Sequence, residues 1–516
     1  MTSASSDSGR MPRYNAAVDL VESNLAAGRG DKLAYIDDYG RYSYAELDFS
    51  VRRTTAALRA AGLEPEQRVL LCMHDSFALP ATFLGAIRAG LVPVLANTLL
   101  TADDYAYMLA DSCATVAIVS ASLAETFEHL RDCVSSFSRL IIDGGESAEL
   151  ARLCAAADCN QPAASTSADE ACFWLYSSGS TGRPKGTVHV HSSLRATAEL
   201  YAQPILGINE NDLVFSAAKL FFAYGLGNAL SFPLSVGATT LLMAERPTPQ
   251  AICKRLVEQR PTIFYGVPTL YAALLASPAL PPADQVRLRR CTSAGEALPE
   301  DIGKRWREHF GLDILDGIGS TEMLHIFLSN RPGDVRLGTT GKAVPGYELR
   351  LVNDNGDEVK TGELGELQVK GPTAAMMYWN NRALSRSTFL GEWTRTGDKY
   401  RVDPDGYYVH CGRCDDMLKV GGIYVSPTEV EGALISHPAV LEAAVVGRAG
   451  SDGLTKPQAF IVLNAGHSAS AALAAELQEF VKSRLAPYKY PRWVNFVSEL
   501  PKTATGKIQR FKLRQG

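Results

Sequence analysis

Short apolar runs alternate with helix-like segments along most of this chain, and this alternation restricts the possible folds more than any other feature. A helix is predicted where a capping box at Ser43 and Glu46 precedes Leu47, Val51 and Leu58 at near-helical spacing. The apolar runs have the length of buried strands; they cover residues 69–73, 116–119, 140–142, 239–243, 262–265 and 313–315. Strands separated by helices form largely parallel sheets covered by helices, so the sequence predicts an α/β fold.

The alternation of strand-like and helix-like segments ends near Pro345. Short strands at 348–352 and 366–370 lie between glycine-rich turns, which predicts a small β-rich subdomain. After Cys414 the chain has two further strand candidates and one helix, at 443–446, 459–463 and 471–485. We therefore expect a large layered α/β domain over 1–414, which includes the β-rich subdomain, and a small α+β domain over 415–516.

Length and charge exclude several classes of protein. A chain of 516 residues is long enough for two or three domains. Its 51 Lys and Arg residues are balanced by 56 Asp and Glu residues, which argues against a generally basic nucleic-acid binder. No apolar run is long enough for a membrane-spanning helix, and residues 1–13 are polar and serine-rich, unlike a signal peptide. We expect a cytoplasmic protein with no membrane or nucleic-acid partner.

The ten cysteines are scattered, and Cys72 lies within an apolar run, which is typical of reduced, buried thiols. Cys411 and Cys414 have the CxxC spacing, but no second pair of metal ligands stands nearby. We interpret this pair as incidental, with a redox or metal role as the less favoured alternative.

A loop rich in glycine and hydroxyl side chains follows the apolar segment 173–175 and extends over residues 176–186. Its small residues let backbone N–H groups approach an anion closely, and its lysine adds a positive charge for a polyphosphate. The candidate phosphate-binding residues are Ser177, Ser178, Gly179, Ser180, Thr181, Gly182 and Lys185. The spacing differs from that of a Walker loop, and a flexible surface turn is the simpler alternative.

Five strings, in this order, resemble motifs of the adenylate-forming superfamily, which comprises acyl-CoA synthetases, adenylation domains and luciferases. The loop 176–186 resembles its phosphate-binding loop. The others resemble the nucleotide and magnesium segment, the ribose motif, the interdomain hinge and the motif of the catalytic lysine; they cover 317–322, 394–398, 412–419 and 501–507. Five motifs in order make coincidence very improbable, and they imply ATP, Mg²⁺ and coenzyme A as ligands.

The resemblance implies a role for individual residues. Lys507 would reach the carboxylate and the α-phosphate, where two anions must approach each other. Glu322 would hold Mg²⁺, and Thr321 would donate to the α-phosphate. Asp398 would accept from the ribose hydroxyls, and Arg413 would reach ribose and phosphate. The resemblance also places Gly295, Asp316 and Ser320 at the nucleotide. Two departures, Ile318 and Thr394, replace residues that are often aromatic in the family.

The hinge string implies movement. In the family, the small domain rotates between adenylate formation and thioester formation, about the position that matches Asp415. Lys507 would leave the site, while Lys419, Gly421 and Gly422 would enter and shape a tunnel for coenzyme A. A plain turn is the simpler interpretation of the two glycines.

Two aromatic segments, 219–228 and 323–327, resemble the benzoate-CoA ligase branch of the superfamily. The resemblance implies that a short, flat pocket for one ring is lined by Ala223, Tyr224, Gly319, His325 and Ile326, with His325 able to donate to the carboxylate. Each segment has a simpler interpretation as part of the core, where aromatic clusters and single histidines are common.

The sequence leaves several functions open. The first is an ATP-dependent aryl-acid CoA ligase, with benzoate as the leading acid and 4-hydroxybenzoate or aminobenzoate close behind, since one ring substituent changes discrimination by only about 1–3 kcal/mol. A second is an adenylation enzyme that loads a carrier protein. A third is a non-catalytic acyl or nucleotide sensor. A homodimer and acetylation of Lys507, which would remove its charge, are further expectations.

Overall fold

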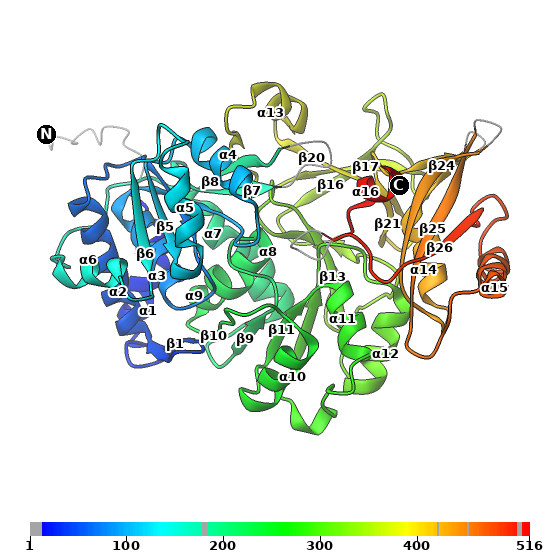
Figure 1. Cartoon of the computed structure of the whole chain (residues 1–516), viewed down its shortest axis with the longest axis horizontal. Coiled ribbons are helices and arrows are strands. Elements are labelled where there is room, and N and C mark those ends of the chain that lie inside the picture. Colours follow the sequence, from blue (N-terminus) through cyan, green and yellow to red (C-terminus); the bar gives the residue numbers. More distant parts are fainter. Residues whose placement is uncertain (1–12, 178–182, 421–422, 451–453, 503–507, 516) are drawn as a thin grey trace, which may run out of the picture.

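The computed structural model describes residues 13–177, 183–420, 423–450, 454–502 and 508–515. In Figure 1 the strands of the first large sheet lie at the upper left, those of the second lie below the centre, and the elements from α14 (Pro427–Ile435) onward lie together at the right. The predicted α/β class is confirmed.

The first large sheet has seven strands in the order β18-β8-β7-β4-β3-β5-β6. Its inner strands are parallel, and β8 and β18 are antiparallel additions at one edge. The strands are β3 (Arg68–Cys72), β4 (Val92–Leu95), β5 (Val116–Ser120), β6 (Arg139–Asp143), β7 (Ala171–Ser177), β8 (Lys185–Val190) and β18 (Met377–Tyr378).

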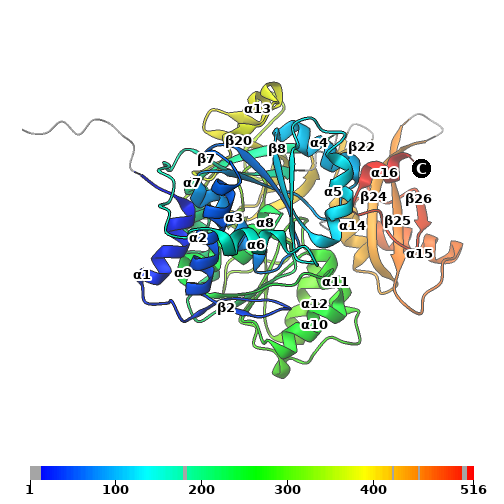
Figure 2. The same ribbon diagram turned by 60° about the vertical axis from the view of Figure 1, so that its left-hand side comes forward.

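Both faces of this sheet are covered, because successive side chains of a strand point to opposite faces. Val69 and Leu71 pack with helices α2 and α3, whereas Leu70 and Cys72 pack with α4 and α5. Figure 2 shows α2, α3 and α6 on one side of the sheet and α4 and α5 on the other. These helices are α2 (Tyr44–Ala60), α3 (Ala78–Ala89), α4 (Ala102–Ser112), α5 (Ala124–Leu130) and α6 (Glu149–Ala156).

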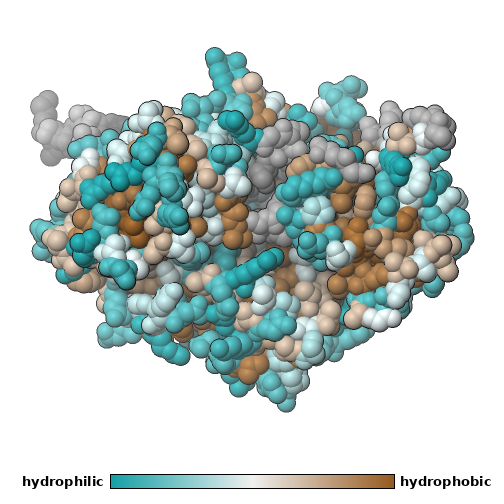
Figure 3. Space-filling model, in the orientation of Figure 1, coloured by the Kyte–Doolittle hydropathy of each residue, from teal (hydrophilic) through white to brown (hydrophobic). Residues whose placement is uncertain are grey.

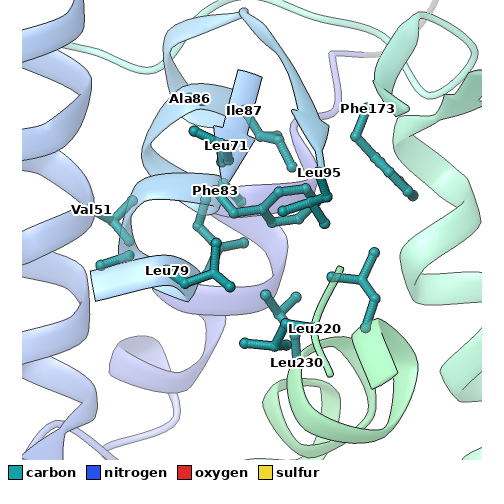
Figure 4. Packing of buried hydrophobic residues seen from close by; sticks show 14 of the residues in the cluster. Val51, Leu71, Leu79, Phe83, Ala86, Ile87, Leu95, Phe173, Leu220 and Leu230 are labelled. Atoms are coloured by element: carbon teal, nitrogen blue, oxygen red, sulfur yellow. The ribbon is translucent and has the colours of Figure 1, made fainter. Parts of the chain in front are cut away.

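The packing of α3 against α2 shows how residue choice fixes the core. A Cβ atom added to Gly85 would lie 2.6 Å from Cβ of Thr54, so the two helices approach more closely than a larger residue would allow. Leu79, Phe83 and Ile87 of α3 extend into the cluster that Figure 4 draws, where they meet side chains from β3, β4 and β7. The capping box predicted at Ser43 and Glu46 is present and begins α2.

The second large sheet has nine strands in the order β15-β14-β13-β12-β11-β9-β10-β1-β2, parallel in its central part and antiparallel at both edges. Its strands are β1 (Leu33–Ile36), β2 (Arg41–Ser43), β9 (Leu213–Ser216), β10 (Thr239–Leu241), β11 (Ile263–Gly266), β12 (Arg290–Ser293), β13 (Ile314–Gly319), β14 (Ile326–Ser329) and β15 (Lys342–Ala343). Helices around this sheet are α7 (His191–Thr197), α8 (Ala223–Leu226), α9 (Phe232–Val236), α10 (Pro249–Glu258), α11 (Pro268–Leu275) and α12 (Glu300–Phe310).

A five-stranded antiparallel sheet follows, which is the β-rich subdomain predicted from the short strands between glycine-rich turns. It consists of β16 (Glu348–Val352), β17 (Gly365–Lys370), β19 (Phe389–Leu390), β20 (Trp393–Val402) and β21 (Tyr408–Arg413), with α13 (Arg382–Thr388) beside it. The short helix α1 (Ser23–Ala26) lies near the start of the described chain.

The C-terminal part has a hydrophobic core of its own, whose members all lie between Leu418 and Phe496. It contains the hairpin β22 (Leu418–Val420) and β23 (Ile423–Val425) and the sheet β24 (Val440–Ala449), β25 (Thr455–Leu463) and β26 (Trp493–Phe496). The helices are α14, α15 (Ala471–Lys482) and α16 (Arg510–Gln515). The predicted strands at 443–446 and 459–463 are shorter than β24 and β25. The antiparallel ladder continues beyond them towards the connection between the strands, where it includes the polar Arg448, Lys456 and Gln458, and β24 also begins three residues earlier, at Val440.

Hydrophilic residues cover most of the face that Figure 3 shows, and hydrophobic residues appear on it in separate groups. Within the described ranges, no helix has the length and apolar character required to cross a membrane. All ten cysteines are free thiols, and Cys72 is buried as predicted.

Candidate active site

The glycine-rich string begins and ends on two paired strands of the seven-stranded sheet. Ser177 at the end of β7 pairs with Lys185 at the start of β8. The hydroxyl of Ser177 is buried and has no hydrogen-bond partner among the described residues. Ser178, Gly179, Ser180, Thr181 and Gly182 lie outside the described residues, and their part in phosphate binding stays a prediction.

A tight turn between β13 and β14 carries the nucleotide and magnesium segment. A Cβ atom at Gly319 would lie 2.5 Å from the backbone of His325, so only glycine allows this close approach. Leu324 completes the turn in the left-handed region, with φ of 64°. The turn leaves the side chains of Thr321 and Glu322 half-buried.

Tyr378 joins the two charged groups that the sequence assigned to the phosphates. Its hydroxyl donates to Oε1 of Glu322 at 2.7 Å, and Nζ of Lys185 lies 4.7 Å from the centre of its ring. Burial, and then the negative charge of Glu322, raise the pKa of Tyr378, so the hydroxyl keeps its proton for this bond. No local pattern in the sequence predicts this role for Tyr378, because it lies 56 residues from Glu322 and belongs to a different sheet.

His189, on β8, contacts the backbone of the same turn. Its Nε2 lies 2.7 Å from the carbonyl oxygen of Thr321, and its ring stacks on Phe173. Burial lowers the pKa of His189 to about 4, so the ring is neutral and its single proton lies on Nε2, which donates to the carbonyl. Local sequence does not distinguish this histidine from an ordinary core residue.

The ribose motif and the start of the hinge lie on neighbouring strands. Asp398 on β20 pairs with Arg413 on β21, and Nη1 of Arg413 lies 3.3 Å from Oδ2 of Asp398. His410 contacts the other carboxylate oxygen at 3.4 Å. Burial alone would lower the pKa of Arg413, but Asp398 and Asp415 more than offset this and raise it. The structure therefore brings Asp398 and Arg413 together as the sequence led us to expect.

The hinge separates two sets of contacts. Asp415 is exposed and lies 3.7 Å from Nε of Arg413, on the N-terminal side. Asp416 instead pairs with Arg514 and lies 3.9 Å from Nη1 of Arg510, both on α16. Lys419 lies on β22, and Gly421 and Gly422 lie outside the described residues, so their roles stay predictions.

A hydrogen bond joins the described part of the C-terminal segment to the loop after β12 in the large domain. The backbone N–H of Ile508 donates to Oε1 of Glu296 at 2.9 Å. Glu296 follows Gly295, whose φ of 99° lies in the region that favours glycine. Lys507 itself lies outside the described residues. Its chain neighbour is therefore held beside Gly295, a predicted nucleotide-site residue.

Aromatic rings surround His325, which follows Glu322 on the turn. The ring centres of Tyr201, Tyr224 and Phe232 lie 5.5, 5.5 and 4.4 Å from its own. Ala223 and Tyr224 are half-buried at the start of α8, whereas Ile326 is buried at the start of β14. Together with Gly319, which adjoins the backbone of His325, these residues lie in one region, as the pocket prediction requires.

The structure gives His325 a different hydrogen bond from the one we expected. Its Nε2 lies 3.2 Å from Oδ1 of Asn228 and 3.3 Å from the carbonyl oxygen of Tyr224, and both are acceptors. Burial lowers the pKa of His325 to about 3, so the neutral ring uses its only proton there. In this arrangement the ring has no proton left to donate to a substrate carboxylate, and the place of His325 in a pocket wall stays a prediction.

Asp316 and Ser320 complete the predicted nucleotide residues. Asp316 is 5% exposed, and its Oδ1 has no hydrogen-bond partner among the described residues. Burial raises the pKa of this carboxyl group well above its usual value, against the effect of two backbone N–H groups. The hydroxyl of Ser320 accepts from the N–H of Met323 at 3.2 Å, which closes a turn that contains Thr321 and Glu322.

The donor set fits Mg²⁺ in the manner of nucleotide enzymes. One oxygen of Glu322 accepts from Tyr378, which leaves the carboxylate oriented and half-buried. In the described parts of the chain, no cluster of three or more His, Cys, Asp or Glu side chains is arranged for a metal. A single carboxylate suffices for Mg²⁺, which is usually bound by one or two carboxylates together with substrate phosphates and water.

Comparison with known proteins identifies the family to which the chain belongs. The model of the AMP-binding enzyme family matches residues 23–379, and that of the AMP-binding enzyme C-terminal domain matches residues 429–507. The chain belongs to the AMP-binding enzyme family. The resemblance to the adenylate-forming superfamily that the sequence indicated is therefore confirmed.

Relatives within the family are similar over nearly their whole length. The chain is 62% identical over 505 residues to a benzoate–CoA ligase of Thauera aromatica, covering 97% of this chain and 96% of that one. It is 50% identical to a 4-hydroxybenzoate–CoA/benzoate–CoA ligase of Rhodopseudomonas palustris, covering 97% and 94%. A crystal structure of a benzoate CoA ligase from Burkholderia xenovorans has 58% identity and a TM-score of 0.92, covering 97% of this chain and all of that chain.

Proposed function

We propose that this protein is an ATP-dependent aryl-acid CoA ligase and that benzoate is its acid, with AMP and pyrophosphate as the other products. The observation that carries the proposal is that His325, around which the aromatic rings of Tyr201, Tyr224 and Phe232 gather, lies on the same turn as Glu322. A ring held there has its carboxylate directed towards the phosphate site. The identity to a benzoate–CoA ligase over nearly the whole chain supports the same acid.

In the first step, a carboxylate oxygen attacks the α-phosphorus of ATP, and the bond to the β-phosphate oxygen breaks. Pyrophosphate leaves with that electron pair, and an acyl adenylate remains. Because the reactants are both anions, positive charge at the reacting oxygens lowers the barrier. Lys507 supplies it, and Thr321 donates to the α-phosphate. Glu322 would hold Mg²⁺, whose charge would neutralise part of that of the phosphates. Ser177, Lys185 and the turn between them bind the outer phosphates.

In the second step, the thiol sulfur of coenzyme A attacks the acyl carbon. The bond to AMP breaks, AMP leaves with the electron pair, and the thiol proton passes to solvent. Asp398 and Arg413 hold the ribose through both steps. Lys419, Gly421 and Gly422 line the path of the thiol after the small domain has turned about Asp415.

A boundary at residues 414 and 415 agrees with this movement. The hydrophobic cluster between Leu418 and Phe496 contains no residue of the large domain, so the small domain can turn without opening a core. Asp416 is paired with α16 and moves with the small domain, whereas Asp415 contacts Arg413 of the large one.

The acid is tested by measuring release of AMP and pyrophosphate, and formation of the CoA thioester, with a panel of ring-substituted benzoates. We expect the highest kcat/KM with benzoate. 4-Hydroxybenzoate is the second candidate, because the hydroxyls of Tyr224 and Thr292 bond each other beside the aromatic rings and offer a polar contact. A non-catalytic sensor would release no AMP with any acid, and a carrier-loading enzyme would form the adenylate but no CoA thioester.

The hydrogen bond between Ile508 and Glu296 predicts that loss of the Glu296 side chain slows adenylate formation but not thioester formation. Glu296→Ala should slow adenylate formation about tenfold, because a hydrogen bond to a charged group contributes about 1.5–3 kcal/mol. Thioester formation from supplied benzoyl adenylate should be unchanged. Glu300→Ala is the control, since Glu300 pairs only with the exposed Lys304 of its own helix among the described ion pairs. Equal slowing of both half-reactions would contradict a role limited to the first.

A cytoplasmic location, a homodimer and acetylation of Lys507 complete the proposal. Acetylation would act directly on the first step, since it removes the positive charge that the step requires.

A further inference from the structure

Two charged side chains, the buried Asp75 and the half-buried Lys219, have no part in the reaction described above. Asp75 lies in the loop between β3 and α3, at the carboxyl end of a central strand of the seven-stranded sheet, and is 4% exposed. Lys219 lies in the loop between β9 and α8, in the nine-stranded sheet. Burying a charge is costly without compensation, so a role for the pair is to be expected.

Asp75 reaches across the junction of the two sheets. Both of its carboxylate oxygens accept from the backbone N–H of Leu220, at 3.3 and 3.2 Å. The side chain of Leu220 enters the core cluster, and Figure 4 shows it with Leu230 beside Leu79 and Phe83 of the α3 segment. The backbone and side chain of Leu220 are therefore both held by the first sheet.

Lys219 fixes the other side of the same loop. Its Nζ donates to the carbonyl oxygen of Glu245 at 2.8 Å and to those of Met243 and Ala244. The chain then folds back, so that Gly225 approaches the backbone of Lys219. A Cβ atom at Gly225 would lie 2.0 Å from the carbonyl oxygen of Lys219, so only glycine fits there. After Lys219 and Leu220, the residues Phe221 and Phe222 lead to Ala223 and Tyr224, with which α8 begins.

We propose that Asp75 is a positioning residue for the acid pocket: its carboxylate holds the Leu220 amide and so fixes the loop that presents Ala223 and Tyr224 to the aryl ring. This inference rests on the proposed function, because it takes those two residues as the wall of the acid pocket. The printed contacts of the Asp75 carboxylate are with the loop that leads to Ala223 and Tyr224, so we expect its effect to fall on the acid and not on ATP.

The electrostatic surroundings make this contact sensitive to pH. Burial raises the pKa of Asp75 to about 6, and the positive charge of Lys219 and the N–H of Leu220 oppose that rise. His74 adjoins Asp75 on its own loop; burial and then Lys219 lower its pKa. Beyond Lys219 lies Arg255, paired with Asp38 and Glu245. Below pH 6 Asp75 takes up a proton, and the bond to Leu220 weakens.

The test compares Asp75→Asn with the wild-type protein in benzoate-dependent pyrophosphate release. We expect KM for benzoate to rise about fivefold, because a bond to a charged acceptor is replaced by one to a neutral acceptor, while KM for ATP stays within about twofold. Asp37→Asn is the matched control. Oδ2 of Asp37 accepts from the N–H of Phe77 in the same junction loop, but that bond does not reach Leu220.

A pH series provides the second measurement, and its first part uses only the wild-type protein. In the wild-type protein, KM for benzoate should rise as the pH falls through about 6, with KM for ATP constant. In Asp75→Asn that dependence should be absent; if it persists, His74 or the substrate is responsible and the proposal is wrong. Equal rises in both KM values, or an unchanged KM for benzoate in the folded variant, would also overturn it. If the wild-type protein releases no pyrophosphate with benzoate, the proposed function fails instead.

Discussion

Lys507→Ala is expected to slow benzoyl adenylate formation by about 100- to 1000-fold, as the loss of a charge that stabilises a transition state does in other enzymes. The reason is that two anions must meet at the α-phosphate, and Lys507 is the cation we assign to that place. Formation of benzoyl-CoA from supplied benzoyl adenylate should be almost unchanged, because by then the small domain has turned. Single-turnover measurements of each half-reaction separate the two effects.

Lys502→Ala is the matched control for this prediction. Nζ of Lys502 pairs with Glu442 at 2.6 Å within the small domain, so its loss removes a positive charge from the same segment without reaching the nucleotide. Both half-reactions should proceed at near wild-type rates in this variant. Equal loss of both half-reactions in Lys507→Ala would contradict the rotation of the small domain between steps.

Glu322→Gln is expected to lower the rate of adenylate formation about 100-fold and to raise the Mg²⁺ concentration needed for half-maximal rate. The amide keeps the size of the side chain and can still accept from Tyr378, but it lacks the negative charge that binds the cation. A titration of pyrophosphate release against Mg²⁺ at saturating ATP measures both effects.

Tyr378→Phe distinguishes the charge of Glu322 from its orientation. This variant keeps the ring under Lys185 but loses the hydroxyl that donates to Glu322. We expect a fall of about tenfold or less, since one hydrogen bond to a carboxylate is lost while its charge remains. If Glu322→Gln leaves the Mg²⁺ dependence unchanged, the assignment of this carboxylate to the metal is wrong.

Local patterns were sufficient to predict the layered fold. The runs at 69–73 and 116–119 correspond to β3 and β5, and their alternate residues pack on opposite faces of one sheet, which is why they are apolar throughout. Ser43 and Glu46 begin α2 as expected because a capping box is a purely local arrangement. The order of strands within each sheet was not predictable, since it depends on contacts between residues far apart in the sequence.

The site was predictable only where its residues belong to contiguous strings. Asp398 and Arg413 meet across neighbouring strands, as their motifs implied. Tyr378 and His189 were missed because each acts on the turn at 319–326 from another part of the chain, through a single hydrogen bond. The bond from His325 to Asn228 was missed for the same reason, so the proton expected for the substrate is used within the pocket wall.

The central claim is that this protein forms an aryl adenylate before coenzyme A takes part. Exchange of labelled pyrophosphate into ATP, measured without coenzyme A, tests this most directly. We predict that exchange depends on benzoate and is lost in Lys507→Ala. Exchange that is absent with every aryl acid, or that begins only when coenzyme A is added, would contradict the account.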